Sequence, residues 1–161
     1  MDSDPIYLRV EANNLEKPLI LDTNIILDLF VFNDPDLVSS KPALLAGLVS
    51  KQLNWIATQD MRIELERVLT YPKITPRMAF YQVTADDVLA KFDQLATLVD
   101  PAPKAKWVCK DPDDQRFIDL AVQHQATLLS KDQAVLCMAK RLLTAGAVVQ
   151  KATDFTPQIS I

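Results

Sequence analysis

Residues 18–30 read PLILDTNIILDLF, an apolar stretch interrupted by the acid Asp22 and the two polar residues that follow it. Leu19–Leu21 has the length and composition of a buried strand, and residues 25–30 have those of a helix. Asp22 therefore lies where a buried strand gives way to a helix. A carboxylate is costly to remove from water unless something pairs with it, so this position calls for a partner elsewhere in the chain.

The composition fits one globular domain. The chain has 161 residues, 49% of them hydrophobic, and its net charge of −4 argues against a general basic coat for nucleic acid. No apolar run approaches the ~18 residues of a membrane span. We assign residues 18–161 to the domain and residues 1–17 to an N-terminal extension, whose IYLRV segment would add an edge strand or a homodimer contact.

The cysteines and the N-terminus indicate a cytoplasmic protein. Cys109 and Cys137 form no C-x-x-C pair, and His124 is the one histidine beside them, so a zinc site is not expected. The acidic N-terminus lacks the apolar region of a secretory signal. Two isolated cysteines in such a chain indicate reduced thiols.

Strand and helix patterns alternate along the chain. Strands are predicted at residues 19–21, 54–57, 107–109, 126–130 and 147–150, and helices at 25–30, 43–51, 59–70, 84–99, from 112 onward and at 133–143, with a short helix beginning at Pro76. Caps are expected at Thr23 or Asn24, Thr84, Asp111 and Gly146. This order predicts an α/β fold, a Rossmann-like three-layer α/β/α sandwich around a mainly parallel sheet of four or five strands.

Two acids follow strands of this sheet. Asp22 comes directly after the first strand, and Asp132 comes two residues after the strand at 126–130. The carboxyl ends of parallel strands form one edge, where α/β sheets bind ligands. We therefore expect both carboxylates at that edge.

Two further acids are expected to turn toward the same edge from helices. Asp114 is three and four residues before Phe117 and Ile118, so it shares the apolar face of its helix. Glu64 flanks the apolar stripe of its own helix more closely than Glu66 does. We call Asp22, Glu64, Asp114 and Asp132 the acidic cluster.

Each acid also has a structural explanation. Asp111 and Asp113 fit a helix cap and first turn beside Pro112. Asp132 is as compatible with a cap as with a site. Three other acids are expected to be ordinary surface or flank residues: Asp28, Glu66 and Asp119.

Four converging carboxylates would repel one another unless cations separated them. Oxygen ligands without His or Cys suit Mg²⁺ or Mn²⁺. Such ions activate water and stabilise both oxygens of an in-line displacement at phosphorus. The acidic cluster therefore predicts a metal-dependent displacement at phosphorus.

Four segments, LILDTNIILDL, MRIELERVL, CKDPDDQRFIDLA and ATLLSKD, resemble the PIN domain family in order and spacing, from about Lys17 to Phe155. The resemblance is to the branch that acts as toxins of toxin–antitoxin systems. It implies a metal-dependent nuclease, usually acting on RNA, with the four acids as catalytic and metal-binding residues and Asn24 and Ser130 as supporting polar residues. It also implies an antitoxin protein as a partner.

Basic and aromatic residues are expected to bind the substrate. Arg116 and Lys131 adjoin members of the acidic cluster and are the favoured phosphate contacts. Other candidates for phosphate contacts are Lys73, Arg77, Lys104, Lys106 and Lys110, and those for base stacking are Phe80, Tyr81 and Trp107. His124 is expected to be structural or exposed.

Three alternatives keep an α/β fold. A PIN-like module would bind RNA or protein without cleavage, and the complete acidic set argues against it. A haloacid-dehalogenase-like phosphatase requires D-x-D after the first strand, where this chain has Asn24 at the third position. A receiver-type phosphoacceptor would carry its aspartate after a middle strand.

Overall fold

The computed structural model describes residues 17–32 and 41–157. All strand pairs in these ranges are parallel. The strands are β1 (Leu19–Leu21), β2 (Ile56–Ala57), β3 (Thr97–Leu98), β4 (Thr127–Leu129) and β5 (Val148–Gln150). The pairs β1–β4–β5 and β2–β3 are joined by a parallel bridge between Leu19 and Trp55, which gives the order β3–β2–β1–β4–β5. The predicted mainly parallel sheet of four or five strands is confirmed.

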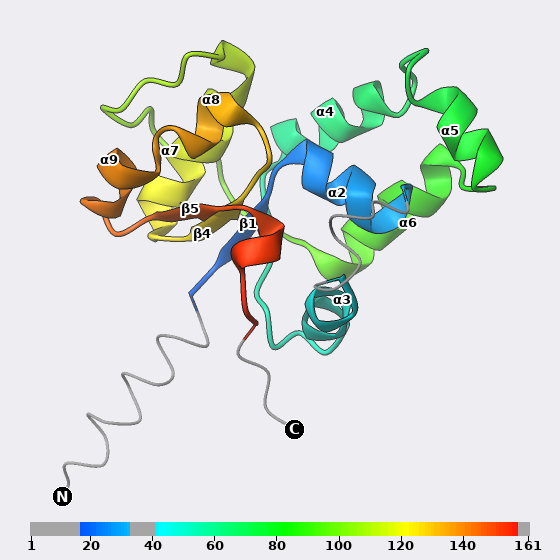
Figure 1. Cartoon of the computed structure of the whole chain (residues 1–161), viewed down its shortest axis with the longest axis horizontal. Coiled ribbons are helices and arrows are strands. Elements are labelled where there is room, and N and C mark those ends of the chain that lie inside the picture. Colours follow the sequence, from blue (N-terminus) through cyan, green and yellow to red (C-terminus); the bar gives the residue numbers. More distant parts are fainter. Residues whose placement is uncertain (1–16, 33–40, 158–161) are drawn as a thin grey trace, which may run out of the picture.

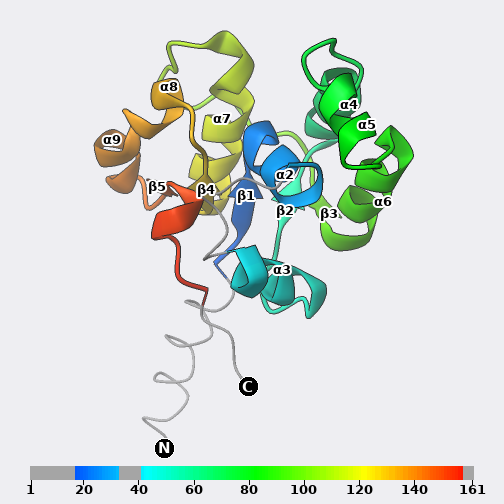
Figure 2. The same cartoon turned by 45° about the vertical axis from the view of Figure 1, so that its right-hand side comes forward.

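Helices cover the sheet on both sides (Figure 1). One group consists of α7 (Gln115–His124), α8 (Gln133–Leu136) and α9 (Ala139–Leu143), and the other of α4 (Gln59–Val68), α5 (Thr75–Phe80) and α6 (Ala85–Leu95). The remaining helices are α2 (Thr23–Phe30), α3 (Lys41–Val49) and the short 3₁₀ turns η2 (Pro112–Asp114) and η3 (Ala152–Asp154). In both views β1 lies between the two groups, and β4 and β5 lie beside α7, α8 and α9 (Figure 2). The layers agree with the predicted α/β/α sandwich.

The core forms where these layers meet. Trp55 of the β2 segment is 1% exposed and packs edge-on against Phe92 of α6, with ring centroids 5.2 Å apart, and stacks on Phe30 of α2 at 6.4 Å. Strands β1 and β4 are buried along their whole length. Burial on both faces explains why their sequences are continuous apolar runs.

Three predicted elements differ from the structure. The helix from Thr84 ends at Leu95, because the N–H groups of Thr97 and Val99 donate to the carbonyls of Trp55 and Ala57 and form β3 instead. The strand predicted at residues 107–109 is wrong: the Trp107 carbonyl and the Cys109 N–H are bound by the Gln115 side chain, which replaces a neighbouring strand.

The helix predicted at residues 133–143 is two helices, α8 and α9. The break is at Met138, which is buried and whose N–H donates to the carbonyl of Val135, three residues back. Two other local predictions are confirmed: Thr84 forms a capping box, and Pro76 lies in the first turn of α5. The C-cap of α9 is Thr144 and not Gly146, which follows two residues later with φ of +85°. None of the helices within the described ranges has the length and hydropathy needed to cross a bilayer.

The N-terminal edge-strand or homodimer prediction falls in residues 1–16, outside the described residues. The assignment of residues 18–161 to a single domain remains a prediction.

Candidate functional site

Asp22 occupies the N-cap position of α2, but its side chain does not cap the helix. The predicted cap at Thr23 or Asn24 is therefore wrong, since both residues lie inside the first turn. The Asp22 carboxylate is 4% exposed and instead accepts a hydrogen bond of 2.6 Å from the hydroxyl of Ser130. This bond supplies the partner that a buried acid after β1 requires.

Ser130 joins two acids that are 110 residues apart in the sequence. Its side chain is fully buried; its hydroxyl donates to Asp22, and its oxygen accepts the backbone N–H of Asp132 at 3.0 Å. Asp132 in turn caps α8, because one of its oxygens accepts the N–H of Ala134 at 3.0 Å. The two interpretations of Asp132 that the sequence left open are therefore compatible: it caps a helix and lies at the edge of the sheet.

Asp114 lies at the end of η2 and is 8% exposed, as its place on the apolar helix face predicts. Asp111, not Asp114, caps η2, because its side chain accepts the N–H of Asp113 at 3.0 Å. One oxygen of Asp114, Oδ2, is buried and has no hydrogen-bond partner among the described residues. An unsatisfied buried carboxylate oxygen is costly and indicates a ligand that the site is built to accept.

The carboxylates of Asp22, Asp114 and Asp132 converge, with one oxygen of each within 4.8 Å of the others. Burial raises the pKa of Asp22, an effect that the Ser130 hydrogen bond opposes and the charge of Asp132 reinforces. Burial, then the neighbouring carboxylates of Asp132 and Asp22, raises the pKa of Asp114 to about 8. Burial and mutual repulsion therefore disfavour the ionised forms of Asp22 and Asp114, and a bound cation would offset both effects.

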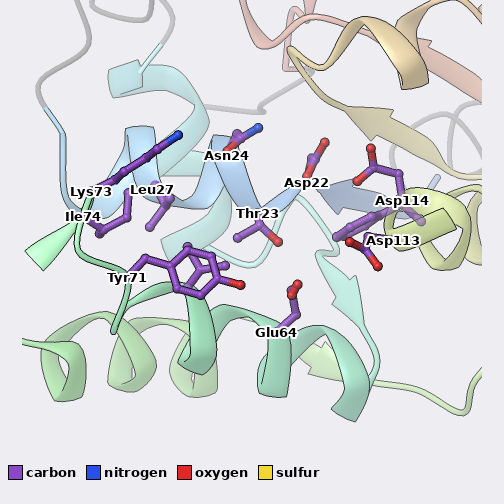
Figure 3. Close-up of a pocket in the computed structure, with 12 residues that line it drawn as sticks. Asp22, Thr23, Asn24, Leu27, Glu64, Tyr71, Lys73, Ile74, Asp113 and Asp114 are labelled. Atoms are coloured by element: carbon purple, nitrogen blue, oxygen red, sulfur yellow. The ribbon is translucent and has the colours of Figure 1, made fainter. Parts of the chain in front are cut away.

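Glu64 lies outside this group of three but lines a cavity together with Asp22 and Asp114 (Figure 3). Its side chain is 16% exposed, and its Oε2 is buried without a hydrogen bond, with the guanidinium of Arg67 3.6 Å away. Glu66 is exposed. Glu64 and not Glu66 is therefore the lining residue, and its role in the site remains a prediction.

The cavity has a volume of about 230 Å³ and lies between α2, α4 and the segment around η2. Figure 3 shows Asp22, Asp113 and Asp114 at one end of it and Leu27, Tyr71 and Ile74 at the other. The full lining consists of Asp22, Thr23, Asn24, Leu27, Glu64, Val68, Tyr71, Lys73, Ile74, Asp113, Asp114 and Phe117. An acidic end and an apolar end thus share one space.

The predicted supporting residues differ in their contacts. Asn24 is exposed and lines the cavity. Arg116 is half-buried and donates to the backbone carbonyl of Asp60 at 3.3 Å, which connects α7 to the start of α4. Lys131 forms an ion pair of 2.8 Å with Asp28. Phosphate contacts by Arg116 and Lys131 remain a prediction.

Asp28 is not the surface or flank acid that the sequence predicted. It is 3% exposed within α2 and holds the ammonium of Lys131, whose neighbours are Ser130 and Asp132. The signal was present in the sequence: Asp28 interrupts an apolar helix as Asp22 ends an apolar strand. Because a buried acid needs a partner, the same argument would have selected both.

Other candidates are distributed over the surface. Lys73 lines the cavity, whereas the guanidinium of Arg77 lies 3.7 Å from the ring centre of Phe32 and the ammonium of Lys106 lies 4.9 Å from that of Trp107. Among the proposed stacking residues, Phe80 is 79% exposed and contacts Tyr81 edge-on. His124 is half-buried at the end of α7.

Tyr71 and Thr23 are lining residues that the sequence analysis did not select as site residues. Thr23 adjoins Asp22, so its place follows from the strand end. Tyr71 follows α4 in an irregular connection, where neither strand nor helix periodicity indicates which way a side chain points.

A family model described as PIN domain matches residues 18–134. Searches of curated proteins and of solved structures gave no match. The matched segment covers most of the chain and includes all four acids, and the chain therefore belongs to the PIN domain family.

Membership of this family, together with the carboxylate cluster, supports a nuclease-type enzyme that acts on nucleic acid. PIN domain nucleases typically use divalent metal ions, and the arrangement of the carboxylates agrees with such a site.

Proposed function

We propose that the protein is a metal-dependent ribonuclease that hydrolyses phosphodiester bonds at the acidic cluster. The observation that carries this proposal is the convergence of Asp22, Asp114 and Asp132 within 4.8 Å. Acids scattered over the chain would be kept so close only where a cation offsets their repulsion.

The donor set fits Mg²⁺ or Mn²⁺. All candidate ligands are carboxylate oxygens, which hard divalent cations prefer, and two of these oxygens, on Glu64 and Asp114, are buried without a hydrogen bond. Asp22, Asp114 and Asp132 would hold the ion, and Glu64 would complete the cluster directly or through water. A bound ion of this kind supplies activation of water and stabilisation of phosphoryl oxygens.

The chain's own residues orient this set. The Ser130 hydroxyl fixes one oxygen of Asp22, and the N–H of Ala134 fixes one oxygen of Asp132. The second carboxylate oxygen of Asp22 and that of Asp132 would therefore be available to a metal ion. A carboxylate of the cluster that remains unligated would accept the proton of the attacking water.

The test is cleavage of labelled single-stranded RNA by the wild type and by Asp22→Asn with Mg²⁺, with Mn²⁺ and with a chelator. Asparagine keeps the shape of the side chain and can still accept from Ser130, so the fold should survive while cleavage is abolished. Asp86→Asn, at an exposed site in the first turn of α6, should retain wild-type activity.

Two outcomes contradict this proposal. Full activity of Asp22→Asn would remove Asp22 from the mechanism. A wild type that binds RNA but cleaves it with neither ion would instead be the PIN-like binding module named among the alternatives.

The role of toxin in a type II toxin–antitoxin pair is a finer proposal, supported by the resemblance of the four sequence segments to that branch of the family. A small antitoxin would occlude the acidic cavity, for instance by inserting an Arg or Lys side chain between the carboxylates. The test is co-purification with the product of a neighbouring small reading frame, which should also suppress cleavage. A partner that binds without suppressing cleavage would contradict occlusion of the cavity.

A further inference from the structure

The apolar end of the cavity has no task in phosphodiester hydrolysis itself. It is lined by Leu27 of α2, Val68 of α4, and Tyr71 and Ile74 of the connection to α5. Tyr71 is 41% exposed, so its ring is available to a ligand. In Figure 3 the ring and the two aliphatic side chains labelled there lie together, beyond Glu64 from the carboxylates.

On the basis of the proposed function, we infer that this apolar end binds one unpaired nucleobase next to the phosphate that is cleaved. We call it the base pocket and define it by Leu27, Val68, Tyr71 and Ile74. A phosphate at the carboxylates would place the adjoining base within the same cavity, because the acidic and apolar ends are continuous. An aromatic ring beside aliphatic side chains is the surface on which single-stranded nucleic acids stack their bases.

The size of the cavity favours a base over a whole small molecule. Its volume of about 230 Å³ is below the roughly 300–1,000 Å³ of sites that enclose drug-sized ligands. A single ring from a longer chain fits this space, with the rest of the chain outside. The base must be unpaired, since a base within a duplex presents its faces to its neighbours and not to a protein ring.

The charged side chains at the two ends of the cavity are compatible with binding of a nucleotide. The carboxylates would repel a phosphate unless a cation were bound there, whereas Lys73, exposed at the lining of the apolar end, offers a positive charge to the next phosphate of the chain. Tyr71 and Lys73 are separated by one residue, so stacking and phosphate contact would come from one short segment.

The experiment combines a change in the protein with a change in the substrate. The cleavage site in a single-stranded RNA oligonucleotide is first mapped with the wild type and Mn²⁺. An abasic residue is then placed at each position flanking that site, and kcat/KM is measured for wild type, Tyr71→Ala and Tyr71→Phe. Ile63→Ala is the matched control, because Ile63 is 43% exposed on α4 and does not line the cavity.

We expect one abasic position to lower the kcat/KM of the wild type by about tenfold, the usual effect of losing one stacked base. Tyr71→Ala should lose about the same factor on the intact oligonucleotide and nothing further on that abasic one. Tyr71→Phe should behave as the wild type, since it keeps the ring, and Ile63→Ala should do so as well.

Losses from Tyr71→Ala that are the same on intact and abasic oligonucleotides would overturn the base pocket, as would no loss on either. A wild type that cleaves none of them would refute the proposed nuclease. Fluorescence anisotropy of the same labelled oligonucleotides then decides the inference separately: affinity that depends jointly on Tyr71 and on one base supports it, and affinity that is indifferent to the base overturns it.

Discussion

The two ends of the sheet carry cavities of different size and chemistry. At the carboxyl end of β1 lies a space of about 230 Å³, with carboxylates at one end and apolar side chains at the other. At the amino ends of β2 and β3 a larger one, of about 510 Å³, is lined by Lys51, Gln52, Leu53, Asn54, Trp55, Leu95 and Thr97. None of these described lining residues is an acid.

The difference lies in how the polar groups are used. At the amino ends, the ammonium of Lys51 donates to the carbonyls of Gln94 and Leu95, and the carbonyls of Asn54 and Trp55 accept N–H groups of β1 and β3. In the cavity near the carboxyl end of β1, one buried oxygen each of Glu64 and Asp114 accepts no hydrogen bond from the described residues, although the Arg67 guanidinium lies 3.6 Å from that of Glu64. Polar groups that are left unsatisfied, not cavity volume, distinguish a site from a gap in packing.

The pH dependence of stability gives the largest expected effect. In the metal-free protein the pKa of Asp114 is raised from 3.8 to about 8. Between these values the unfolded chain has released the proton that the folded chain retains, so the free energy of unfolding should fall as pH rises. The slope is up to about 1.4 kcal/mol per pH unit and vanishes above pH 8.

Urea unfolding in a chelating buffer from pH 4 to pH 9 measures this slope. Asp114→Asn should reduce it, since asparagine does not titrate. Saturating Mn²⁺ should offset the fall, because metal ions bind the deprotonated carboxylates. Equal slopes for the wild type and Asp114→Asn in chelator would show that the titration of Asp114 does not cause the pH dependence of stability.

The second prediction concerns the two hydrogen bonds by which Ser130 links Asp22 to Asp132. Ser130→Ala removes the hydroxyl that orients Asp22 and accepts the Asp132 N–H. Loss of such an outer contact typically weakens metal affinity by about 10–100-fold. Calorimetric titration with Mn²⁺ should show this loss, and cleavage should recover at high metal concentration.

Ser50→Ala is the matched control at the other end of the sheet. The Ser50 hydroxyl donates to the carbonyl of Gly47 at 3.3 Å, and its replacement should leave Mn²⁺ affinity unchanged. Unchanged affinity in Ser130→Ala would mean that Asp22 is oriented without Ser130.

The contrast between the two ends also separates what the sequence predicts from what it does not. Asp22 and Asp132 follow strands, and parallel strands bring their ends together, so their convergence could be inferred from order alone. Asp114 and Glu64 followed from helical periodicity. These predictions need only the direction of an element and the face of a helix.

The remaining features depend on contacts between distant segments. β3 forms because Thr97 and Val99 pair with the segment of Trp55, whereas their local sequence continues a helical pattern. The strand predicted at residues 107–109 is replaced by the bonds of Gln115. Tyr71 reaches the cavity from an irregular connection. Side-chain direction in such segments is decided by tertiary packing, which periodicity does not report.

The smallest expected effect tests the amino end. Lys51 has φ of +66°, a left-handed conformation that is unfavourable for residues with a Cβ atom. Lys51→Ala keeps that conformation and loses the bonds to Gln94 and Leu95, so we expect a loss of about 1 kcal/mol in the free energy of unfolding. Lys51→Gly loses the same bonds but relieves the backbone, so it should be more stable than Lys51→Ala.

Neither Lys51 variant should change cleavage or Mn²⁺ affinity, because Lys51 bonds the end of α6 and does not line the acidic cavity. Chemical denaturation and cleavage of the same RNA oligonucleotide check both parts. A decrease in cleavage by either variant, at equal Mn²⁺ affinity, would mean that the larger cavity also contacts the substrate. Unsatisfied polar groups would then no longer distinguish a functional site from a gap in packing. The larger cavity, whose polar groups are already hydrogen-bonded, would also take part in function.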